Sequence, residues 1–434
     1  MTSLPPTGDL LLVLPFTPAL LADPSPLLPL IYSAAKSVSG SATVLFSTPP
    51  PASSDHPDGQ LYATLRSAPK AHWSALSHFL AQVYSALAAG QQAADNFLTE
   101  VEVRFDGELG EWQHKLPAVP QRVIVLDSYA DLASRILETA GVTAPHHTVP
   151  SPALPQPGSL QPATSAPGYP VTALGGTFDH LHAAHKILLH IGLFVTEKRL
   201  FNGIISPELL ASKSNAHLVQ SLDQRIANVA AFLNRTGPGD TLVEVEEIKD
   251  ALGPTRWDPT IKALVVSRET LNGGADINKV RKADNLEELT VLSIDVISSD
   301  IDGVADDTTF RTVNLASATD AQLKTEKFGS SGIRSWMSGH GINGPGGLAS
   351  SPNVPRAGAT IDPATGKPHQ AGLTRAELEA KRAAEAAGSG GGLQSSPNVP
   401  RPGATLDPAT GKPHQAGLTR AELEAKRAAE GANK

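Results

Sequence analysis

The chain has 434 residues, 40% of them hydrophobic, which is enough for two or three domains with sizeable cores; its 36 prolines and 37 glycines indicate long irregular connections. The formal net charge of −8 argues against a nucleic-acid-binding surface. The chain has no cysteine, so disulfides, thiolate catalysis and thiolate metal sites are excluded.

The first apolar stretch, residues 10–32, has no basic start and is interrupted by Asp23 and several prolines. These features favour a strand, a turn and a helix over a signal or membrane segment. We therefore expect a cytoplasmic protein with no membrane or nucleic-acid partner.

Alternating apolar segments predict an N-terminal α/β domain over residues 1–142, smaller than the unit that follows. We expect strands at residues 10–16, 42–46, 98–105 and 122–127, and helices at 25–38, 72–89 and 129–140. Segment 98–105 alternates like a strand with only one buried side. This domain has no phosphate loop or catalytic constellation, so its role stays open, with docking or structural support the simpler interpretation.

Residues 143–169 are rich in proline, serine, alanine and glutamine, which predicts a semi-rigid extended linker. His146 and His147 within it are expected to be solvated. A second α/β unit is expected over residues 170–340, with strands at 169–174, 199–205, 241–248 and 261–266 and helices at 183–196 and 222–233.

The central motif lies at the start of this second unit, where residues 175–185 have the sequence GGTFDHLHAAH. An apolar strand stops at two glycines, and a helix begins beside His182 and His185. Helix N-termini attract phosphate, glycines allow close backbone approach, and imidazoles add donors. From spacing alone, the histidine pair is also compatible with a metal site or a surface position.

The motif resembles the signature of the HxGH nucleotidylyltransferases, and in particular that of phosphopantetheine adenylyltransferases of the eukaryotic and archaeal type. Further blocks of the resemblance lie at residues 250–254, 264–270, 277–281, 286–289 and 327–334. Two positions depart from the pattern: Ala184 stands where the general motif has glycine, and Gly332 replaces a usual hydroxyl residue.

The resemblance implies a Rossmann-like doubly wound parallel sheet of the nucleotidylyltransferase type, and transfer of the adenylyl group of ATP to 4′-phosphopantetheine in coenzyme A biosynthesis. It implies His185, His182 and Lys213 as catalytic residues, with Thr177 and Lys213 binding the acceptor phosphate. It places ATP against Gly176, Phe178, His185, Asn278, Arg281, Ser330, Ser331 and Arg334, with Arg225 a weaker candidate. Mg²⁺ is expected to be carried with ATP, with no dedicated protein metal site.

Two alternatives stay open. One is another HxGH nucleotidylyltransferase that uses a different acceptor, such as nicotinamide mononucleotide or a sugar phosphate. The other is a catalytically weakened scaffold in a complex with other coenzyme A pathway enzymes, for which Ala184, Gly332 and the repeated C-terminal tail are the motivation.

The C-terminal region, residues 341–434, carries two near-identical repeats at residues 350–385 and 395–430. Each repeat offers only two leucines in its helix-forming half, too few for a core, so we expect a disordered tail with transient helices. The repeats are interpreted either as an inert duplication or as a bivalent docking motif.

Overall fold

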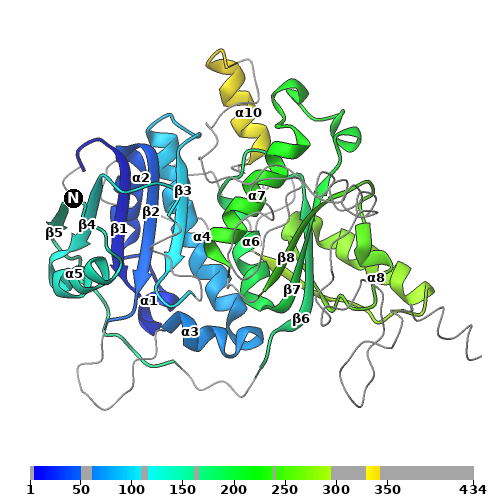
Figure 1. Ribbon diagram of the computed structural model, residues 1–434, viewed down its shortest axis with the longest axis horizontal. Helices are drawn as coiled ribbons and strands as arrows, with labels where there is room; N and C mark the ends of the chain where they lie inside the picture. Colours follow the sequence, from blue (N-terminus) through cyan, green and yellow to red (C-terminus); the bar gives the residue numbers. More distant parts are fainter. Residues whose placement is uncertain are drawn as a thin grey trace, which may run out of the picture. The chain divides into compact units, whose positions relative to one another are not determined.

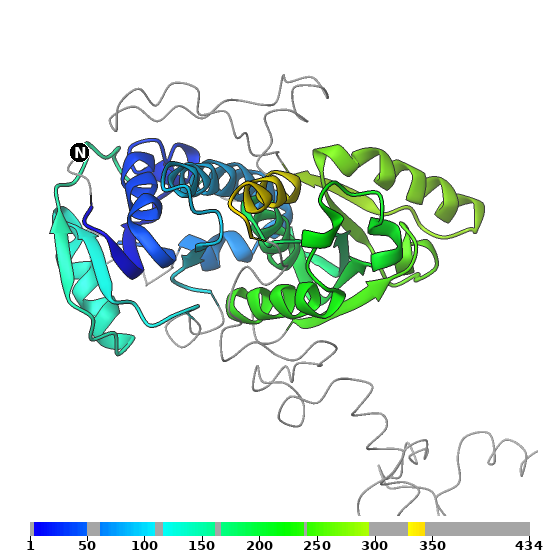
Figure 2. The same ribbon diagram turned by 90° about the horizontal axis from the view of Figure 1, so that it is seen from above.

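The computed structural model describes residues 4–49, 61–108, 116–160, 166–237, 241–294 and 329–342. These ranges form two five-stranded parallel sheets with helices packed on them (Figures 1 and 2). The predicted α/β class is confirmed. The predicted tail, apart from Gly341 and Ile342, lies outside the described residues, as does everything proposed for its repeats.

The first sheet has the strand order β3-β2-β1-β4-β5. Its strands are β1 (Thr7–Pro15), β2 (Val38–Ser47), β3 (Glu100–Phe105), β4 (Arg122–Leu126) and β5 (His146–Val149). Leu10 to Leu14 are all buried, as expected for an interior strand of a parallel sheet covered on both faces. Leu11 and Val13 pack with residues of α5, and the alternate leucines pack with residues of α2 and α4.

The helices of the first unit connect successive parallel strands. They are α1 (Pro18–Ala22), α2 (Leu28–Ser37), α3 (Leu61–Arg66), α4 (Pro69–Ala93) and α5 (Ala130–Thr139), with a 3-10 turn η2 (Asp127–Tyr129). Strand β5 lies within the segment that was predicted to be a linker. Its residues His146–Val149 pair with β4 and so extend the sheet. The first unit therefore continues past the predicted boundary at residue 142. Both sheets have five strands among the described residues.

The second sheet has the order β10-β9-β6-β7-β8. Its strands are β6 (Tyr169–Gly176), β7 (Thr196–Ile205), β8 (Leu242–Ile248), β9 (Ala263–Ser267) and β10 (Thr290–Ile294). Counted from its own first strand, this order is the same as that of the first sheet. Each sheet therefore has the doubly wound arrangement, in which the strand order reverses beside the first strand.

The helices of the second unit are α6 (Ala183–Val195), α7 (Leu222–Thr236), α8 (Leu271–Ala283) and α10 (Ser330–Gly339). Short 3-10 turns fill the connections: η3 (Pro207–Leu210), η4 (Ala216–Leu218), η5 (Gly253–Arg256) and η6 (Arg268–Thr270). None of the described helices combines the length and the apolar content that a membrane crossing requires.

The two units share one apolar core. Helix α4 of the first unit packs against α6 of the second (Figure 1). A single cluster of buried side chains includes Phe79 and Phe105 from the first unit together with Phe194 and Phe232 from the second. His190 of α6 lies in this cluster, 5.2 Å from the Phe232 ring by centroids. Burial, aided by Arg104, lowers the pKa of His190 to about 3, so its ring is neutral.

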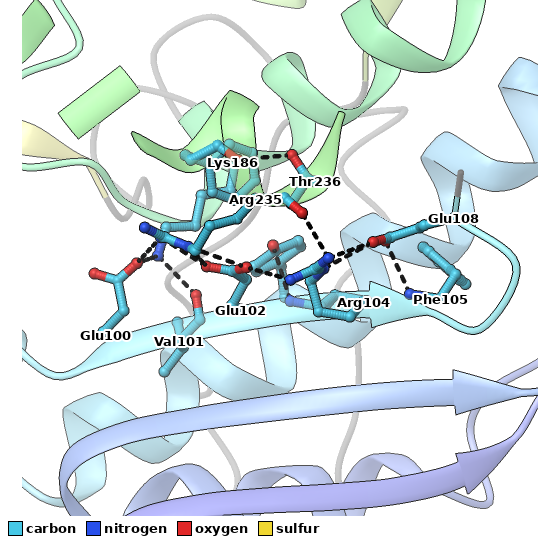
Figure 3. Close-up of polar contacts among 12 residues, drawn as sticks. Glu100, Val101, Glu102, Arg104, Phe105, Glu108, Lys186, Arg235 and Thr236 are labelled. Carbon is cyan, nitrogen blue, oxygen red and sulfur yellow. Dashed lines mark hydrogen bonds and ion pairs between the residues drawn. The ribbon is translucent and has the colours of Figure 1, made fainter. Parts of the chain in front are cut away.

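Strand β3 differs from its prediction, because the side expected to face solvent is buried against the second unit. Figure 3 shows its charged side chains pointing toward α6 and α7. Glu102 is 0% exposed and accepts a 2.8 Å bond from Arg235, while Arg104 donates to the Arg235 carbonyl. Burial alone raises the pKa of Glu102, but Arg235 and Arg104 more than offset it and hold the pKa below its usual value.

Candidate active site

The loop between β6 and α6 is held by residues distant in sequence. Phe178 and His180 have φ angles of 49° and 45°, a region that non-glycine residues rarely adopt. The Gln220 side chain accepts from the His180 N–H at 2.9 Å, and the Gln220 N–H donates to the Asp179 carboxylate at 2.9 Å. A Cβ at Gly176 would lie 3.1 Å from the Phe178 ring, so this position favours glycine. The loop is thus fixed before any ligand arrives.

The two histidines of the motif lie side by side at the start of α6. Their ring centroids are 3.9 Å apart with an interplanar angle of 27°, and Phe178 lies 5.0 Å from His185. His182 is the N-cap residue of α6, so both rings lie near the positive end of the helix dipole. Both line a cavity of about 740 Å³.

This cavity lies at the carboxyl ends of the central strands, where doubly wound sheets bind ligands. Gly176, Thr177, Phe178 and Lys213 line it together with the two histidines. The lining also includes residues from the end of β9 to the first turn of α8 and residues of the start of α10: Ser267, Thr270, Gly273, Gly274, Ser330, Ser331, Gly332 and Arg334. Ala184 also lines the cavity, so its methyl group occupies space that glycine would leave open.

Helix α10 is docked onto the motif loop through Asp179. Ser330 donates to the Asp179 carbonyl at 2.7 Å, and Arg334 forms an ion pair with the Asp179 carboxylate. Arg334 is 2% exposed and also donates to the Ser214 carbonyl and the Ser331 hydroxyl. The side chains of Ser330 and Arg334 therefore hold the helix in place. The backbone N–H groups of its first turn are left for a ligand, as helix N-termini provide.

Arg225, Asn278 and Arg281 do not line the cavity. Buried Arg225 donates to the carbonyls of Thr177 and Ile205, each at 2.9 Å, and so supports the motif loop from behind. Asn278 exchanges two hydrogen bonds with the Leu289 backbone. Arg281 donates to the carbonyls of Thr255, Asp258 and Glu287. All three side chains bind the protein's own backbone in this structure.

Asp179 and Gln220 help to form the site, although neither was predicted as a site residue. Asp179 lies inside the motif, but its carboxylate forms an ion pair with Arg334, which lies more than one hundred residues further along the chain. Asp179 was visible as a motif residue, whereas Gln220 carries no signal in the sequence. Among the described residues, no group of three or more histidine, aspartate or glutamate side chains is placed to hold a metal ion.

The comparisons with known proteins concern the second unit. A cytidylyltransferase-like family model matches residues 173–334, from β6 into α10. The phosphopantetheine adenylyltransferase of Saccharomyces cerevisiae is 43% identical over 127 residues, which are 29% of this chain and 41% of that protein. The phosphopantetheine adenylyltransferase of Methanothermobacter thermautotrophicus is 32% identical over 136 residues, which are 31% of this chain and 79% of that protein.

The chain belongs to the phosphopantetheine adenylyltransferase family. The resemblance identified from the motif and the following blocks is thereby confirmed, as is the nucleotidyltransferase type of the second unit. A third relative in the family, from Thermococcus kodakarensis, is 30% identical over 30% of this chain and 78% of its own length. The chain spans less than half the length of the yeast relative that it matches. The family model does not include the first sheet.

Proposed function

We propose that this protein transfers the adenylyl group of ATP to 4′-phosphopantetheine, giving dephospho-CoA and pyrophosphate. The observation that carries the proposal is one cavity lined both by the stacked His182 and His185 and by the N-terminal turn of α10. Its volume of about 740 Å³ is in the range of cavities that hold a nucleotide-sized ligand. The site thus combines two helix N-termini, two imidazoles and a lysine around one space.

The reaction needs no nucleophilic side chain, because the phosphate of the acceptor attacks the α-phosphorus of ATP. A new phosphorus–oxygen bond forms, the bond between the α-phosphorus and the bridging oxygen breaks, and pyrophosphate leaves with that oxygen. The protein aligns two polyanions and stabilises the negative charge that develops in the transition state.

Six of the residues that line the cavity have a role in this proposal. His185 donates to the α-phosphate in the transition state, with His182 beside it. Thr177, at the end of β6, binds the acceptor phosphate, and Lys213 bridges the acceptor and the α-phosphate. The N–H groups of Ser331 and Gly332 at the start of α10 receive the β- and γ-phosphates. Mg²⁺ would arrive bound to ATP and neutralise part of its phosphate charge.

Two positions in the cavity motivate a test of the alternative functions. Ala184 narrows the cavity beside the histidines, and Gly332 supplies no hydroxyl at the start of α10. Either change is compatible with a different acceptor or with a weakened enzyme that acts as a scaffold.

A pyrophosphate-release assay with ATP and a panel of acceptors separates these functions. The panel contains 4′-phosphopantetheine, nicotinamide mononucleotide and glucose 1-phosphate. We expect turnover with 4′-phosphopantetheine at least about a hundredfold above the other two, a ratio that specific polar contacts to the acceptor can supply. Turnover with another acceptor would replace the substrate, and no turnover with any acceptor would favour the scaffold.

A further inference from the structure

Helix α10 is attached to the rest of the protein at both of its ends. Its first turn is held by Asp179 of the motif loop, as described above. Its last turn is held by the first α/β unit, through Asp95. The Trp336 indole N–H donates to one Asp95 carboxylate oxygen at 2.6 Å, and a His340 ring nitrogen lies 2.9 Å from the other.

Asp95 is presented by a defined backbone. It lies directly after Ala94, the C-cap of α4, and has a φ angle of 49°, which turns the chain at the end of that helix. Phe97, two residues on, packs edge to face on Trp336 with ring centroids 5.4 Å apart. The indole therefore contacts both a carboxylate and an aromatic ring from the first unit. The His340 ring lies beside it, with ring centroids 4.4 Å apart.

The charges at this contact reinforce each other. Hydrogen bonds from Trp336 and His340 lower the pKa of Asp95. The Trp336 carbonyl and Asp95 raise the pKa of His340. Both shifts favour the ionised partners, so the contact is a charge-assisted one.

The first unit also holds the helix that carries the histidine pair. Lys186, next to His185, is 1% exposed; its ammonium group donates to the Glu100 carboxylate at 2.9 Å and to the Val101 carbonyl at 2.7 Å. Strand β3 and the end of α4 thus reach both helices whose N-termini face the cavity.

We propose that the first α/β unit is a positioning element of the active site, and that Asp95 is a positioning residue that sets the orientation of α10 toward the ATP phosphates. The proposal rests on the proposed adenylyl transfer. A ten-residue helix is about 15 Å long. When its far end is released, it can tilt about the Arg334–Asp179 ion pair. The phosphate-facing turn then moves, while His182, His185 and the acceptor site keep their own supports.

Asp95→Gly is the variant that tests this, because glycine removes both acceptor oxygens and adopts a positive φ without strain. The KM for ATP should rise about three- to fivefold, the upper end of the loss expected for an exposed charge pair. The kcat at saturating ATP and the KM for 4′-phosphopantetheine should stay within about twofold. Asp95→Asn, which tolerates positive φ and keeps an acceptor for Trp336, should fall between Asp95→Gly and the wild type.

Asn285→Gly is the matched control. Asn285 is exposed, lies just after α8 and has a φ angle of 56°, and its N–H donates to the Lys282 carbonyl of α8. It should leave both KM values unchanged. Equal losses of kcat and of both affinities in Asp95→Gly would mean a merely structural role and overturn the proposal, as would an unchanged KM for ATP.

Amide hydrogen exchange of residues 331–342 gives a readout that does not depend on turnover. Exchange in α10 should be faster in Asp95→Gly than in Asn285→Gly, and binding of ATP measured by calorimetry should be weaker. If the protein proves inactive with 4′-phosphopantetheine, these two measurements still decide the positioning role separately from the proposed reaction. Unchanged exchange would contradict it.

Discussion

The Lys186 ammonium group lies 2.9 Å from the Glu100 carboxylate, so the residue that follows His185 is anchored in the edge strand of the first sheet. This pair belongs to an interface network in which three acidic side chains meet three basic ones: Glu100, Glu102, Glu108, Arg104, Lys186 and Arg235. The network also satisfies the backbone of β3, since Lys186 donates to the Val101 carbonyl. An edge strand that would otherwise offer free carbonyls is thereby covered.

Lys186→Met should lower the free energy of unfolding by about 1–3 kcal/mol, because it leaves the buried Val101 carbonyl without its donor and the Glu100 carboxylate with Arg235 alone. Urea unfolding measures the loss. Lys279→Met is the matched control, since Lys279 pairs with Asp276 on the surface with 77% of its side chain exposed. That change should leave the free energy of unfolding nearly unchanged, because an exposed ion pair contributes little. Equal losses in the two variants would show that the interface pair contributes nothing beyond a surface pair.

His185→Ala should lower kcat by about 100- to 1000-fold with little change in the affinity for ATP, as expected when one preorganised transition-state donor is removed. Steady-state kinetics with ATP and 4′-phosphopantetheine measure both quantities. His147→Ala, which changes an exposed histidine on β5, is the control and should leave kcat and the affinity for ATP unchanged. Near wild-type turnover in His185→Ala would remove this histidine from the mechanism.

Gly332→Thr should lower the KM for ATP by about three- to tenfold. A Cβ at Gly332 meets no atom within 4 Å, so the added hydroxyl can face the cavity without displacing anything and donate to a phosphate. Gly339→Thr places the same residue in open space at the other end of α10 and controls for helix propensity. If both variants change the KM alike, the start of α10 does not bind the nucleotide phosphates.

The buried His190 makes stability depend on pH. Its pKa in the folded protein is about 3, below the 6.5 of an unfolded chain. As pH falls through 6.5 the unfolded state takes up a proton and the folded state does not, so stability is lost. This group should cost about 2–3 kcal/mol between pH 7.5 and pH 4.5.

His190→Gln cannot titrate and so isolates that effect. The difference in unfolding free energy between the variant and the wild type, measured by urea unfolding at the two pH values, should shift by this amount in favour of the variant at pH 4.5. Parallel pH profiles would mean that the His190 ring takes up its proton in the folded protein as readily as in the unfolded chain.

Local patterns in the sequence were sufficient for most of the elements. The apolar runs and the glycine-to-helix junction predicted β1, β6, α4 and α6, because these signals depend on neighbours in the chain. Strand β5 was missed, since its exposed residues His146 and His147 carry no apolar pattern and it forms only by pairing with β4.

Long-range partners explain what the sequence could not predict. Glu102 and Arg104 alternate with apolar residues in the way solvent-facing positions do, yet they are buried because α7 supplies Arg235. Arg334 was expected to face a phosphate, and in this structure it is paired with Asp179. A charged residue in a motif does not reveal whether its partner is a ligand or the protein itself.

Mass spectrometry of the product formed from ATP and 4′-phosphopantetheine tests the proposed reaction itself, with His185→Ala run beside the wild-type chain. We predict dephospho-CoA and pyrophosphate in equal amounts from the wild type, and at least about a hundredfold less of both from the variant in the same time. Absence of dephospho-CoA from the wild type, or its formation at an equal rate by the variant, would contradict the account.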